Sequence, residues 1–247
     1  MKEALSIILI AHNEEKNIGS MIEGLLKHYS KEIMEILVVD DASTDETAAI
    51  AESWQRRNLK VKLILRTPPC GVGRALRTGF SHVHPQAKYI LTMDSDFTKN
   101  IEQVSSLLEV IEKSDCDGVI GSRFIPGSIL INYPLLKKLM NRLFHALVRR
   151  IFHIQQHDLT NNFKLYKVEI IKGMPWRSND FALNAETGIF PIIAGYNVKE
   201  FPVVWAGRSQ DMGKTKFSIF KFGGSYIRVI FYSWILLRQK RKISLKL

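Results

Sequence analysis

The sequence has few of the features that mark a specialised class of protein. Its two cysteines, Cys70 and Cys116, lack the spacing of a metal site, so we expect ordinary thiols in a reducing, cytosolic setting. Low-complexity segments are absent and 46% of the residues are hydrophobic, which argues against disorder. The amino terminus has an early acid, a short apolar run and no cleavage site, so we expect no secretory signal. The 247 residues fit one large α/β domain, or one domain with an appendage.

No nucleic-acid-binding motif accompanies the formal net charge of +11. The positive charge is uneven, being concentrated after about residue 135 and especially in the RQKRK segment near the end. An anionic membrane surface or a phosphate-bearing substrate explains this distribution better than nucleic acid does. We therefore expect a membrane surface, and no nucleic acid, among the partners.

The sequence also lacks an uncharged apolar run long enough to cross a membrane. Lys221 and Arg228 interrupt the apolar stretch at 217–237, and its uncharged part makes only about two and a half helical turns. We predict that residues 218–247 form a basic, aromatic, membrane-associating segment, with Trp234 at the headgroup level, beyond a domain formed by residues 1–217. The alternative is a terminal helix docked on the domain.

Apolar runs of strand length alternate with amphipathic, helix-like segments through the first half of the chain. The runs are LSIILI at 5–10, ILVV at 36–39, VKLIL at 61–65 and YILTM at 89–93. This alternation predicts an α/β fold with a parallel, doubly wound sheet. Further strands are expected at 118–121 and, as an edge strand, at 198–204.

Two carboxylates follow the fourth of these strands. Asp94 and Asp96 lie one residue apart, so in an extended segment they point the same way. Ligands gather at the carboxyl ends of the strands in an α/β sheet, and Mg²⁺ or Mn²⁺ takes carboxylate oxygens together with water and substrate phosphate. The pair is therefore a candidate metal site, with a strand end and a helix amino terminus as the alternative.

Other polar groups follow the neighbouring strands. An Asn-Glu pair (Asn13, Glu14) follows the first strand and an Asp pair (Asp40, Asp41) the second, whereas Arg123 follows the fifth, where a guanidinium can hold phosphate. Gly71 and Gly73 lack the spacing of a dinucleotide fingerprint, which leaves turn chemistry or a phosphate contact as their role.

Three segments of the second half carry further predictions. Residues 135–152 have an apolar stripe and several cations, which suits either an interfacial amphipathic helix or a core-packed helix with a basic outer face. Glu186 lies in a helix of mixed polarity and is expected to be buried. A polar, glycine-containing loop carries Arg208, Lys214 and Lys216, which could close over an anionic ligand.

In this order, the motifs resemble glycosyltransferase family 2, and within it the polyprenyl-phosphate sugar synthases typified by dolichol-phosphate mannose synthase. The matching segments are AHNEEKNI (11–18), VVDDASTDET (38–47), GVGRALRTGF (71–80), MDSDF (93–97), GSRF (121–124), DLTNNFKLY (158–166), the Glu186 region and RSQDMGKTKF (208–217). Each is weak alone, but eight in the order of the family are specific. The chain departs from the pattern at Ile10, where proline is usual, at Thr98, where glutamine is usual, and at 162–164, where Asn-Phe-Lys replaces Gly-Phe-Arg.

The resemblance implies a GT-A (Rossmann-like) domain that binds a nucleotide-diphosphate sugar and a divalent metal, Mg²⁺ or Mn²⁺. It assigns the nucleotide's base and ribose to the residues after the first two strands, and metal and diphosphate to Asp94 and Asp96. It assigns donor and acceptor phosphates to the basic residues. Asp158 falls in a family segment near the active site. The residues so implied in substrate binding are Asn13, Glu14, Asp40, Asp41, Asp94, Arg123, Glu186, Arg208, Lys214 and Lys216. Those implied in catalysis are Asp96, Asp158 and Arg123.

The expected activity is inverting, metal-dependent transfer of a hexose to a polyprenyl phosphate, at the cytosolic face of a membrane. The resemblance favours mannose from GDP-mannose, with a UDP-sugar as the other donor. A lipid phosphate is already ionised at neutral pH and needs no strong base. One alternative is a hydroxyl acceptor, for which Asp158 or Glu186 would be the candidate base. The other is a non-catalytic nucleotide-sugar-binding or membrane scaffold protein.

Overall fold

The structure, a computed structural model, describes residues 2–95, 98–206 and 219–244 (the side chains of 98–100, 219–222 and 239–244 excepted). Strands and helices alternate through the first half as β1 (Leu5–Ala11), α1 (Ile18–Tyr29), β2 (Ile33–Asp40), α2 (Thr47–Arg57), β3 (Val61–Leu65), α3 (Val72–His82) and β4 (Tyr89–Asp94). The second half contains η1 (Thr98–Gln103), α4 (Val104–Lys113), β5 (Gly118–Ser122), β6 (Ile129–Ile131), α5 (Leu135–Phe152), β7 (Lys164–Lys167), α6 (Val168–Gly173), α7 (Leu183–Ala194), β8 (Val198–Pro202), β9 (Val204–Ala206) and α8 (Ile219–Ser244).

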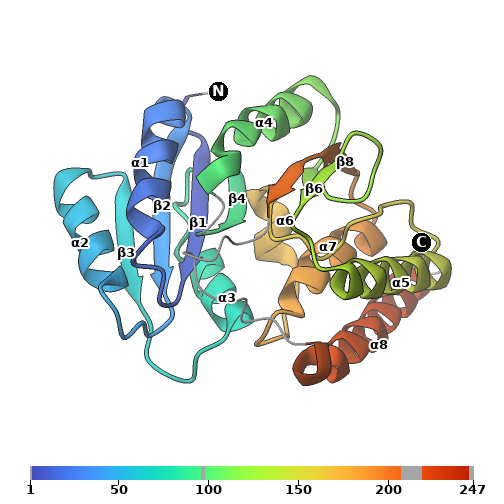
Figure 1. Ribbon diagram of the computed structural model, residues 1–247. Helices are drawn as coiled ribbons and strands as arrows, with labels where there is room; N and C mark the ends of the chain where they lie inside the picture. Colours follow the sequence, from blue (N-terminus) through green and yellow to red (C-terminus); the bar gives the residue numbers. More distant parts are fainter. Residues whose placement is uncertain (1, 96–97, 207–218, 245–247) are drawn as a thin grey trace.

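One seven-stranded sheet forms the centre of the molecule, with the strand order β3-β2-β1-β4-β7-β5-β8 (Figure 1). Strands β1 to β4 are parallel to one another, as are β5 and β8, whereas β7 runs antiparallel to both of its neighbours. The predicted α/β fold with a mostly parallel sheet is confirmed, and β8 lies at the edge of the sheet as predicted. A second, two-stranded sheet pairs β6 with β9.

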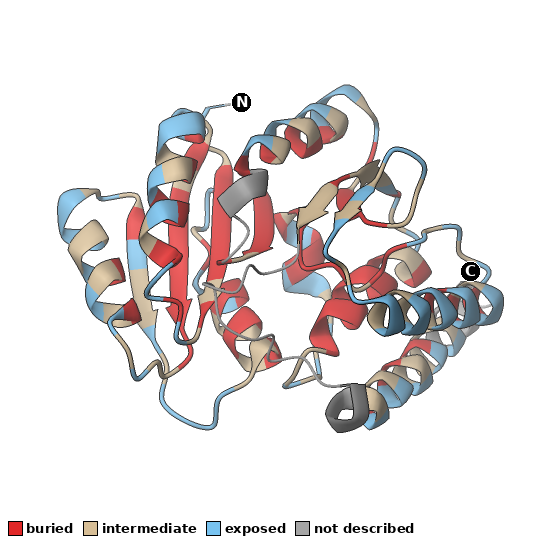
Figure 2. Cartoon of the chain, in the orientation of Figure 1, coloured by how far each residue is buried: buried red, intermediate tan, exposed pale blue. Residues whose placement is uncertain are grey.

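The sheet is covered on both faces because successive strand side chains point to opposite sides. On one face Leu5, Ile7 and Leu9 pack with α1, α2 and α4. On the other, Ile8 packs with α3, α6 and the start of α7. The central strands are buried over most of their length (Figure 2), and each buried aliphatic side chain contributes about 1.5–3 kcal/mol to folding.

A third apolar cluster lies beside the sheet, where α7 is covered by α5 and α8. Val148 and Phe152 of α5, Ile189 and Phe190 of α7 and Val229 of α8 belong to it. The ring of Phe144 on α5 also meets that of Tyr226 on α8 edge-on, with the centroids 5.2 Å apart. Helices α5 and α8 thus form one layer at the lower right of Figure 1.

Helix α5 begins and ends as the sequence predicts, but its apolar stripe faces away from the core. His145, Val148 and Phe152 are its buried residues, whereas the stripe residues Leu139 and Leu143 are 53% and 56% exposed. The core-packed alternative for this stripe is therefore wrong. Among the described residues, no helix is both long enough and apolar enough to cross a membrane.

Candidate functional site

The carboxyl ends of β2, β1 and β4 lie side by side and bring two predicted aspartates together. These strand ends form the carboxyl-terminal edge of the sheet (hereafter the edge). The register pairs Ala11 with Asp40 on one side of β1 and Ile10 with Asp94 on the other. Because adjacent strands lie about 4.8 Å apart, the two carboxylates come from positions about 10 Å apart across β1. This separation suits a ligand with one polar group at each end.

The loop after β1 is interlocked with the loop after β2. Asn13 adopts a left-handed backbone conformation (φ 55°), donates its N–H to Ser43 Oγ (3.0 Å) and accepts the N–H of Thr44 on Oδ1 (2.8 Å). The N–H of the buried Glu14 donates to Thr47 Oγ1 (2.8 Å), and its carboxylate accepts Asn17 Nδ2 (2.9 Å). The structure therefore places Asn13 and Glu14 where they fix the shape of the edge.

The two carboxylates after β2 have different surroundings. Asp41 is engaged on both oxygens, by the Arg66 guanidinium and by the N–H of Gly71 (2.6 Å). Asp40 accepts the N–H of Ser43 on Oδ2 (3.1 Å), but its buried Oδ1 has no hydrogen-bond partner among the described residues. An unsatisfied buried acceptor costs about 1–3 kcal/mol, so Asp40 is the member of this pair that is suited to accept a hydrogen bond from a ligand.

Gly71 and Gly73 are explained by the close approach of another segment of the chain. A Cβ at Gly71, whose φ is 157°, would lie 2.3 Å from the carbonyl oxygen of Asn179, and one at Gly73 would lie 2.5 Å from that of Ser178. The N–H of Arg74 also donates to the Asn179 carbonyl (3.3 Å). These contacts favour packing against the 178–180 loop over a phosphate contact as the role of both glycines.

The Gly73→Ala substitution is expected to lower the free energy of unfolding by about 2 kcal/mol, because the new methyl group overlaps backbone atoms that cannot move independently. Gly173→Ala, where a Cβ meets nothing within 4 Å, is the matched control and should change stability by less than about 1 kcal/mol. Urea unfolding of both variants measures the difference. If Gly73→Ala kept normal stability but bound nucleotide more weakly, a phosphate contact would be the better explanation for Gly73.

Asp94 lies at the end of β4 and is half-buried. Its Oδ1 accepts a hydrogen bond from Asn162 Nδ2 (2.9 Å), and Asn162 is fixed in turn by Thr92, whose hydroxyl donates to the Asn162 carbonyl (2.6 Å). A held carboxylate at this edge fits a hard divalent cation that draws its other ligands from water and phosphate. Among the described residues, no group of three or more His, Cys, Asp or Glu is arranged to hold a metal ion, and the second predicted ligand, Asp96, lies outside these residues.

Arg123 is held at the end of β5 by a buried carboxylate. Asp158 Oδ2 accepts Arg123 Nε (2.6 Å) and Oδ1 accepts Nη2 (2.8 Å), a bidentate pair in which both side chains are buried. The guanidinium lies 5.4 Å from the Phe124 ring centroid and 5.9 Å from that of Tyr133. Its position is therefore fixed by charge and by two aromatic rings.

The same contacts occupy Asp158 fully. It also accepts the backbone N–H groups of Arg123 (2.9 Å), Thr160 (3.4 Å) and Asn161 (3.2 Å) and has no exposed surface. Burial alone raises the pKa of the Asp158 carboxyl, but the charge and hydrogen bonds of Arg123 outweigh it and hold this pKa below its usual range. This geometry favours a positioning role for Asp158 over proton abstraction from a substrate.

His145 of α5 completes this buried group. Its Nε2 is 3.3 Å from the N–H of Leu159 and 3.3 Å from the Thr160 hydroxyl, so it acts as an acceptor. Burial lowers the pKa of His145 to about 4, and the imidazole is neutral at pH 7. The sequence alone did not single out His145, because a single histidine in an amphipathic helix carries no distinctive signal.

Lys164 takes the place of the arginine that is usual in the family segment and is fully buried. Its Nζ donates to the Asn184 carbonyl (2.6 Å) and to Thr187 Oγ1 (2.9 Å), which ties β7 to α7. Burial lowers the pKa of Lys164 to about 7, with the nearby Asp158 carboxylate partly opposing this shift. Lys164 therefore links the two elements and does not face the edge of the sheet.

This pKa predicts a rise in stability with pH. Between pH 7 and about 9.5 the folded chain has lost the Lys164 proton while the unfolded chain keeps it, so the free energy of unfolding increases with pH, by up to about 1.4 kcal/mol per unit. The Lys164→Met variant should lack this rise. Urea unfolding of both proteins at pH 7, 8 and 9 measures it, and parallel curves would contradict the assignment.

Glu186 is buried as predicted, and its carboxylate binds the backbone of residues 177 and 178. It accepts the N–H groups of Arg177 (2.8 Å) and Ser178 (2.9 Å) and the Ser178 hydroxyl. Burial raises the pKa of the Glu186 carboxyl, and these hydrogen bonds partly offset the rise. Glu186 thus holds the loop that lies over Gly71 and Gly73.

The predicted basic loop residues Arg208, Lys214 and Lys216 lie outside the described residues.

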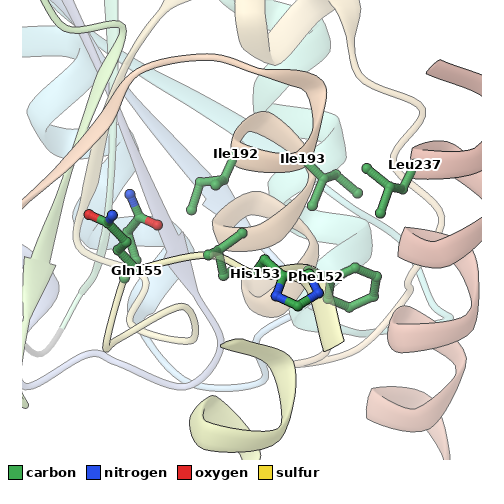
Figure 3. A pocket seen from close by; sticks show the side chains of 8 residues that line it. Phe152, His153, Gln155, Ile192, Ile193 and Leu237 are labelled. Carbon is green, nitrogen blue, oxygen red and sulfur yellow. The ribbon is translucent and has the colours of Figure 1, made fainter. Parts of the chain in front are cut away.

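A pocket of about 370 Å³ lies apart from this edge, where the ends of α5 and α7 meet α8 (Figure 3). Its apolar side is formed by Phe152, Ile192, Ile193 and Leu237. Gln156 forms part of its polar side and donates a hydrogen bond to the carbonyl of Val198, the first residue of β8. Its lining contains no Asp, Glu, Lys or Arg, so it does not suit a metal or a diphosphate.

Comparison with known proteins finds a matching family and several relatives. The family model described as Glycosyl transferase family 2 matches residues 6–174. The chain is 28% identical over 227 residues to a polyprenol monophosphomannose synthase of Mycolicibacterium smegmatis, covering 90% of this chain and 82% of that one. It is 28% identical over 221 residues to a dolichyl-phosphate hexose transferase of Haloferax volcanii, covering 90% of each.

The fold is also that of a solved glycosyl transfer enzyme. Glucosyl-3-phosphoglycerate synthase from Mycobacterium tuberculosis, in complex with Mn²⁺, UDP and phosphoglyceric acid, superimposes with a TM-score of 0.72 over 94% of this chain and 78% of that one. The two sequences are 17% identical, so this likeness concerns the GT-A-like fold alone.

Proposed function

Because this chain belongs to glycosyltransferase family 2, we propose that it transfers a hexose from a nucleotide-diphosphate sugar to a polyprenyl phosphate. Its relatives include enzymes named for polyprenol, dolichyl-phosphate and undecaprenyl-phosphate. The undecaprenyl-phosphate mannosyltransferase of Micrococcus luteus is 27% identical to this chain over 188 residues, which cover 74% of this chain and 76% of that one. The likeness to the mannose-transferring relatives favours GDP-mannose as donor over a UDP-sugar.

The observation that carries the acceptor assignment is the complete engagement of the candidate bases. Asp158 holds Arg123, and Glu186 holds the 177–178 backbone, so neither carboxylate faces a substrate hydroxyl. A hydroxyl acceptor requires a base to remove its proton. A phosphate monoester is already ionised and attacks without one, so this site suits a phosphate acceptor.

The residues of the edge divide between donor and acceptor. We assign Asp40, with its unpartnered Oδ1, to the nucleoside side of the proposed donor and Asp94 to the diphosphate side. Asp94 and Asp96 would hold Mg²⁺ or Mn²⁺, which would supply positive charge to stabilise the departing diphosphate. Arg123 is assigned to the acceptor phosphate, and the sequence-predicted cations Arg208, Lys214 and Lys216 to the donor and acceptor phosphates.

The reaction then needs no covalent intermediate with the protein. A phosphate oxygen of the lipid attacks the anomeric carbon as the bond from that carbon to the nucleoside diphosphate breaks, and the configuration inverts. The contribution of Arg123 is to position the acceptor phosphate, because its guanidinium is oriented before the reaction begins. The enzyme would work at the cytosolic face of a membrane, where its lipid acceptor is embedded.

An acceptor comparison tests this proposal. The purified chain is given labelled GDP-mannose, Mn²⁺ and one of three acceptors in detergent: a polyprenyl phosphate, the same polyprenol without phosphate, or a free saccharide. We expect transfer to the polyprenyl phosphate only. Transfer to the saccharide at a comparable rate would contradict the phosphate-acceptor assignment and favour the alternative of a hydroxyl acceptor.

A further inference from the structure

The hydrogen bonds of Arg123 can be followed donor by donor, since a guanidinium has five N–H groups. The N–H of Nε goes to Asp158 Oδ2 (2.6 Å), and the two of Nη2 go to Asp158 Oδ1 (2.8 Å) and Thr160 Oγ1 (3.1 Å). Nη1 makes one long contact, with the Tyr133 hydroxyl (3.4 Å). The second N–H of Nη1 is therefore left without a hydrogen bond to the described residues, and its direction depends on how firmly the other N–H groups are held.

The Thr160 hydroxyl is the adjustable partner in this arrangement. A hydroxyl rotates about its C–O bond and can turn either its proton or a lone pair toward a neighbour. To accept Arg123 Nη2, Thr160 Oγ1 has to turn its proton elsewhere. His145 Nε2 lies 3.3 Å from Oγ1 and is positioned to accept that proton. The hydrogen bonds thus run from Arg123 Nη2 to Thr160 Oγ1, and from the Thr160 hydroxyl to His145 Nε2.

The protein backbone sets the direction of these hydrogen bonds. The N–H of Leu159 can only donate, and it points at the same His145 Nε2 (3.3 Å). Nε2 therefore carries no proton, and the proton of the neutral imidazole is on Nδ1. Asp158 Oδ1 is 3.8 Å from Nε2, which is too far for a hydrogen bond. His145 consequently acts on Arg123 through Thr160 and not through the carboxylate.

The imidazole of His145 is held rigidly and is neutral. It is buried, with its ring centroid 5.6 Å from that of Phe124 and 5.7 Å from that of Phe144. Burial lowers the pKa of His145 to about 4; the Asp158 carboxylate opposes this shift, and three cations add to it. These cations are Arg123, Lys164 and Arg149. The ring is thus an acceptor over the whole pH range in which a lipid phosphate is ionised.

The other ring nitrogen of His145 makes a purely structural role a poor explanation. Nδ1 is buried and has no hydrogen-bond partner among the described residues. A buried N–H without a partner destabilises the fold, and an apolar ring of similar size would not carry it. The imidazole therefore has a cost at Nδ1, and Nε2 is the atom whose contacts can account for it.

We propose that His145 is a positioning residue, which orients Arg123 through the Thr160 hydroxyl so that the remaining N–H of Nη1 meets the acceptor phosphate. This inference rests on the proposed function, because that function assigns Arg123 to the acceptor phosphate. Orientation of a binding group before the substrate arrives lowers the entropy that binding has to remove. The contribution of His145 is therefore expected in the use of the acceptor and not in the use of the nucleotide sugar.

Steady-state transfer kinetics of the purified chain with a polyprenyl phosphate in detergent measure this contribution. His145→Phe keeps a planar ring and removes the acceptor nitrogen, whereas Thr160→Val keeps the branched shape and removes the hydroxyl. Each variant should raise the KM for polyprenyl phosphate about tenfold, equivalent to about 1.4 kcal/mol, and leave the KM for the nucleotide sugar within about twofold. His145→Gln places an amide oxygen near the position of Nε2 and should keep the acceptor KM within about threefold of the wild type.

The double variant His145→Phe with Thr160→Val tests the route of the effect. If both residues act on Arg123 through the same hydrogen bonds, the acceptor KM of the double variant equals that of either single variant. A rise of about a hundredfold would overturn the route through Thr160. A lower kcat with both KM values unchanged in the single variants would also overturn the proposal, because a smaller fraction of folded enzyme produces that pattern.

The matched control is His82→Phe. His82 is exposed at the end of α3, and its Nδ1 contacts only the Thr78 carbonyl and the Ser81 hydroxyl of the same helix. Both KM values of this variant should stay within about twofold of the wild type. A rise in the acceptor KM equal to that of His145→Phe would overturn the assignment to His145.

Nitrogen NMR of the histidine-labelled chain tests the hydrogen bonds without catalysis. The His145 signal, identified by its loss in His145→Gln, should be that of the neutral Nδ1–H tautomer at pH 7 and down to about pH 5, one unit above its pKa of about 4. A proton on Nε2 at pH 7, in the other tautomer or in the imidazolium, would overturn the proposal, because Nε2 could then not accept the Thr160 hydroxyl.

Solvent exchange of the Arg123 Nε–H separates this inference from the proposed reaction. The exchange should be about tenfold faster in His145→Phe and Thr160→Val than in the wild type, and unchanged in His145→Gln. This pattern, combined with no sugar transfer to any lipid phosphate, would support the positioning of Arg123 and contradict the proposed function. Transfer with an acceptor KM that ignores His145→Phe would support the function and contradict the inference.

Discussion

The Arg123→Met variant is expected to lose sugar transfer and about 3–5 kcal/mol of its free energy of unfolding together. The substitution removes the cation that compensates the buried Asp158, and an uncompensated charge in the interior is strongly destabilising. It also removes the guanidinium that we assign to the acceptor phosphate. Urea unfolding and the transfer assay measure the two effects on the same preparation.

A second variant separates stability from activity. Asp158→Asn added to Arg123→Met removes the uncompensated charge and keeps a carbonyl oxygen for the backbone N–H groups of Thr160 and Asn161. We expect the double variant to recover at least half of the lost stability and none of the transfer. Recovery of transfer in the double variant would show that Arg123 serves only to neutralise Asp158.

Asp94→Asn is expected to lower kcat/KM for transfer about a thousandfold while the fold is kept. Asparagine retains an oxygen for the hydrogen bond from Asn162, so the free energy of unfolding should change by less than about 1 kcal/mol. The lost charge is the one assigned to the metal, whose contribution to stabilising the leaving diphosphate is several kcal/mol. The same loss is expected for Asp96→Ala.

Asp115→Asn is the matched control for this experiment. Asp115 is exposed and precedes β5, at the opposite edge of the sheet from Asp94, and its substitution changes the net charge by the same amount. Its kcat/KM should stay within about threefold of the wild type. If Asp94→Asn also stayed within threefold at every Mn²⁺ concentration, the assignment of Asp94 as a metal ligand would be wrong.

The sequence was informative about elements whose patterns are local. Alternation of apolar runs with helical segments predicted β1 to β4 and the helices between them, and the bounds of α5 agree with the predicted 135–152. The strand β7 was missed, because its four residues begin and end with lysine and its burial depends on pairing with β4 and β5 and on contacts with α7, all distant in the sequence. Periodicity also cannot tell which side of a helix meets the core, so the outward stripe of α5 required the structure.

In the candidate site too, the sequence predicted the positions of residues but not their distant partners. The strand ends placed Asp40, Asp94 and Arg123 at one edge of the sheet, because chain direction and strand length are local properties. The roles of their partners depend on distant contacts. Arg123 and Asp158 are 35 residues apart in the chain, and nothing in either segment predicts the bidentate pair that makes Asp158 a positioning residue.

The transfer of labelled sugar from a nucleotide donor to a polyprenyl phosphate, with and without a divalent metal, tests the central claim most directly. The purified chain is incubated with labelled GDP-mannose or a labelled UDP-sugar, polyprenyl phosphate in detergent, and Mn²⁺, Mg²⁺ or EDTA. We predict that label from one donor moves into the organic phase with either metal and remains in the aqueous phase with EDTA. Binding of the nucleotide without transfer of label from any donor to the lipid would contradict the proposed function.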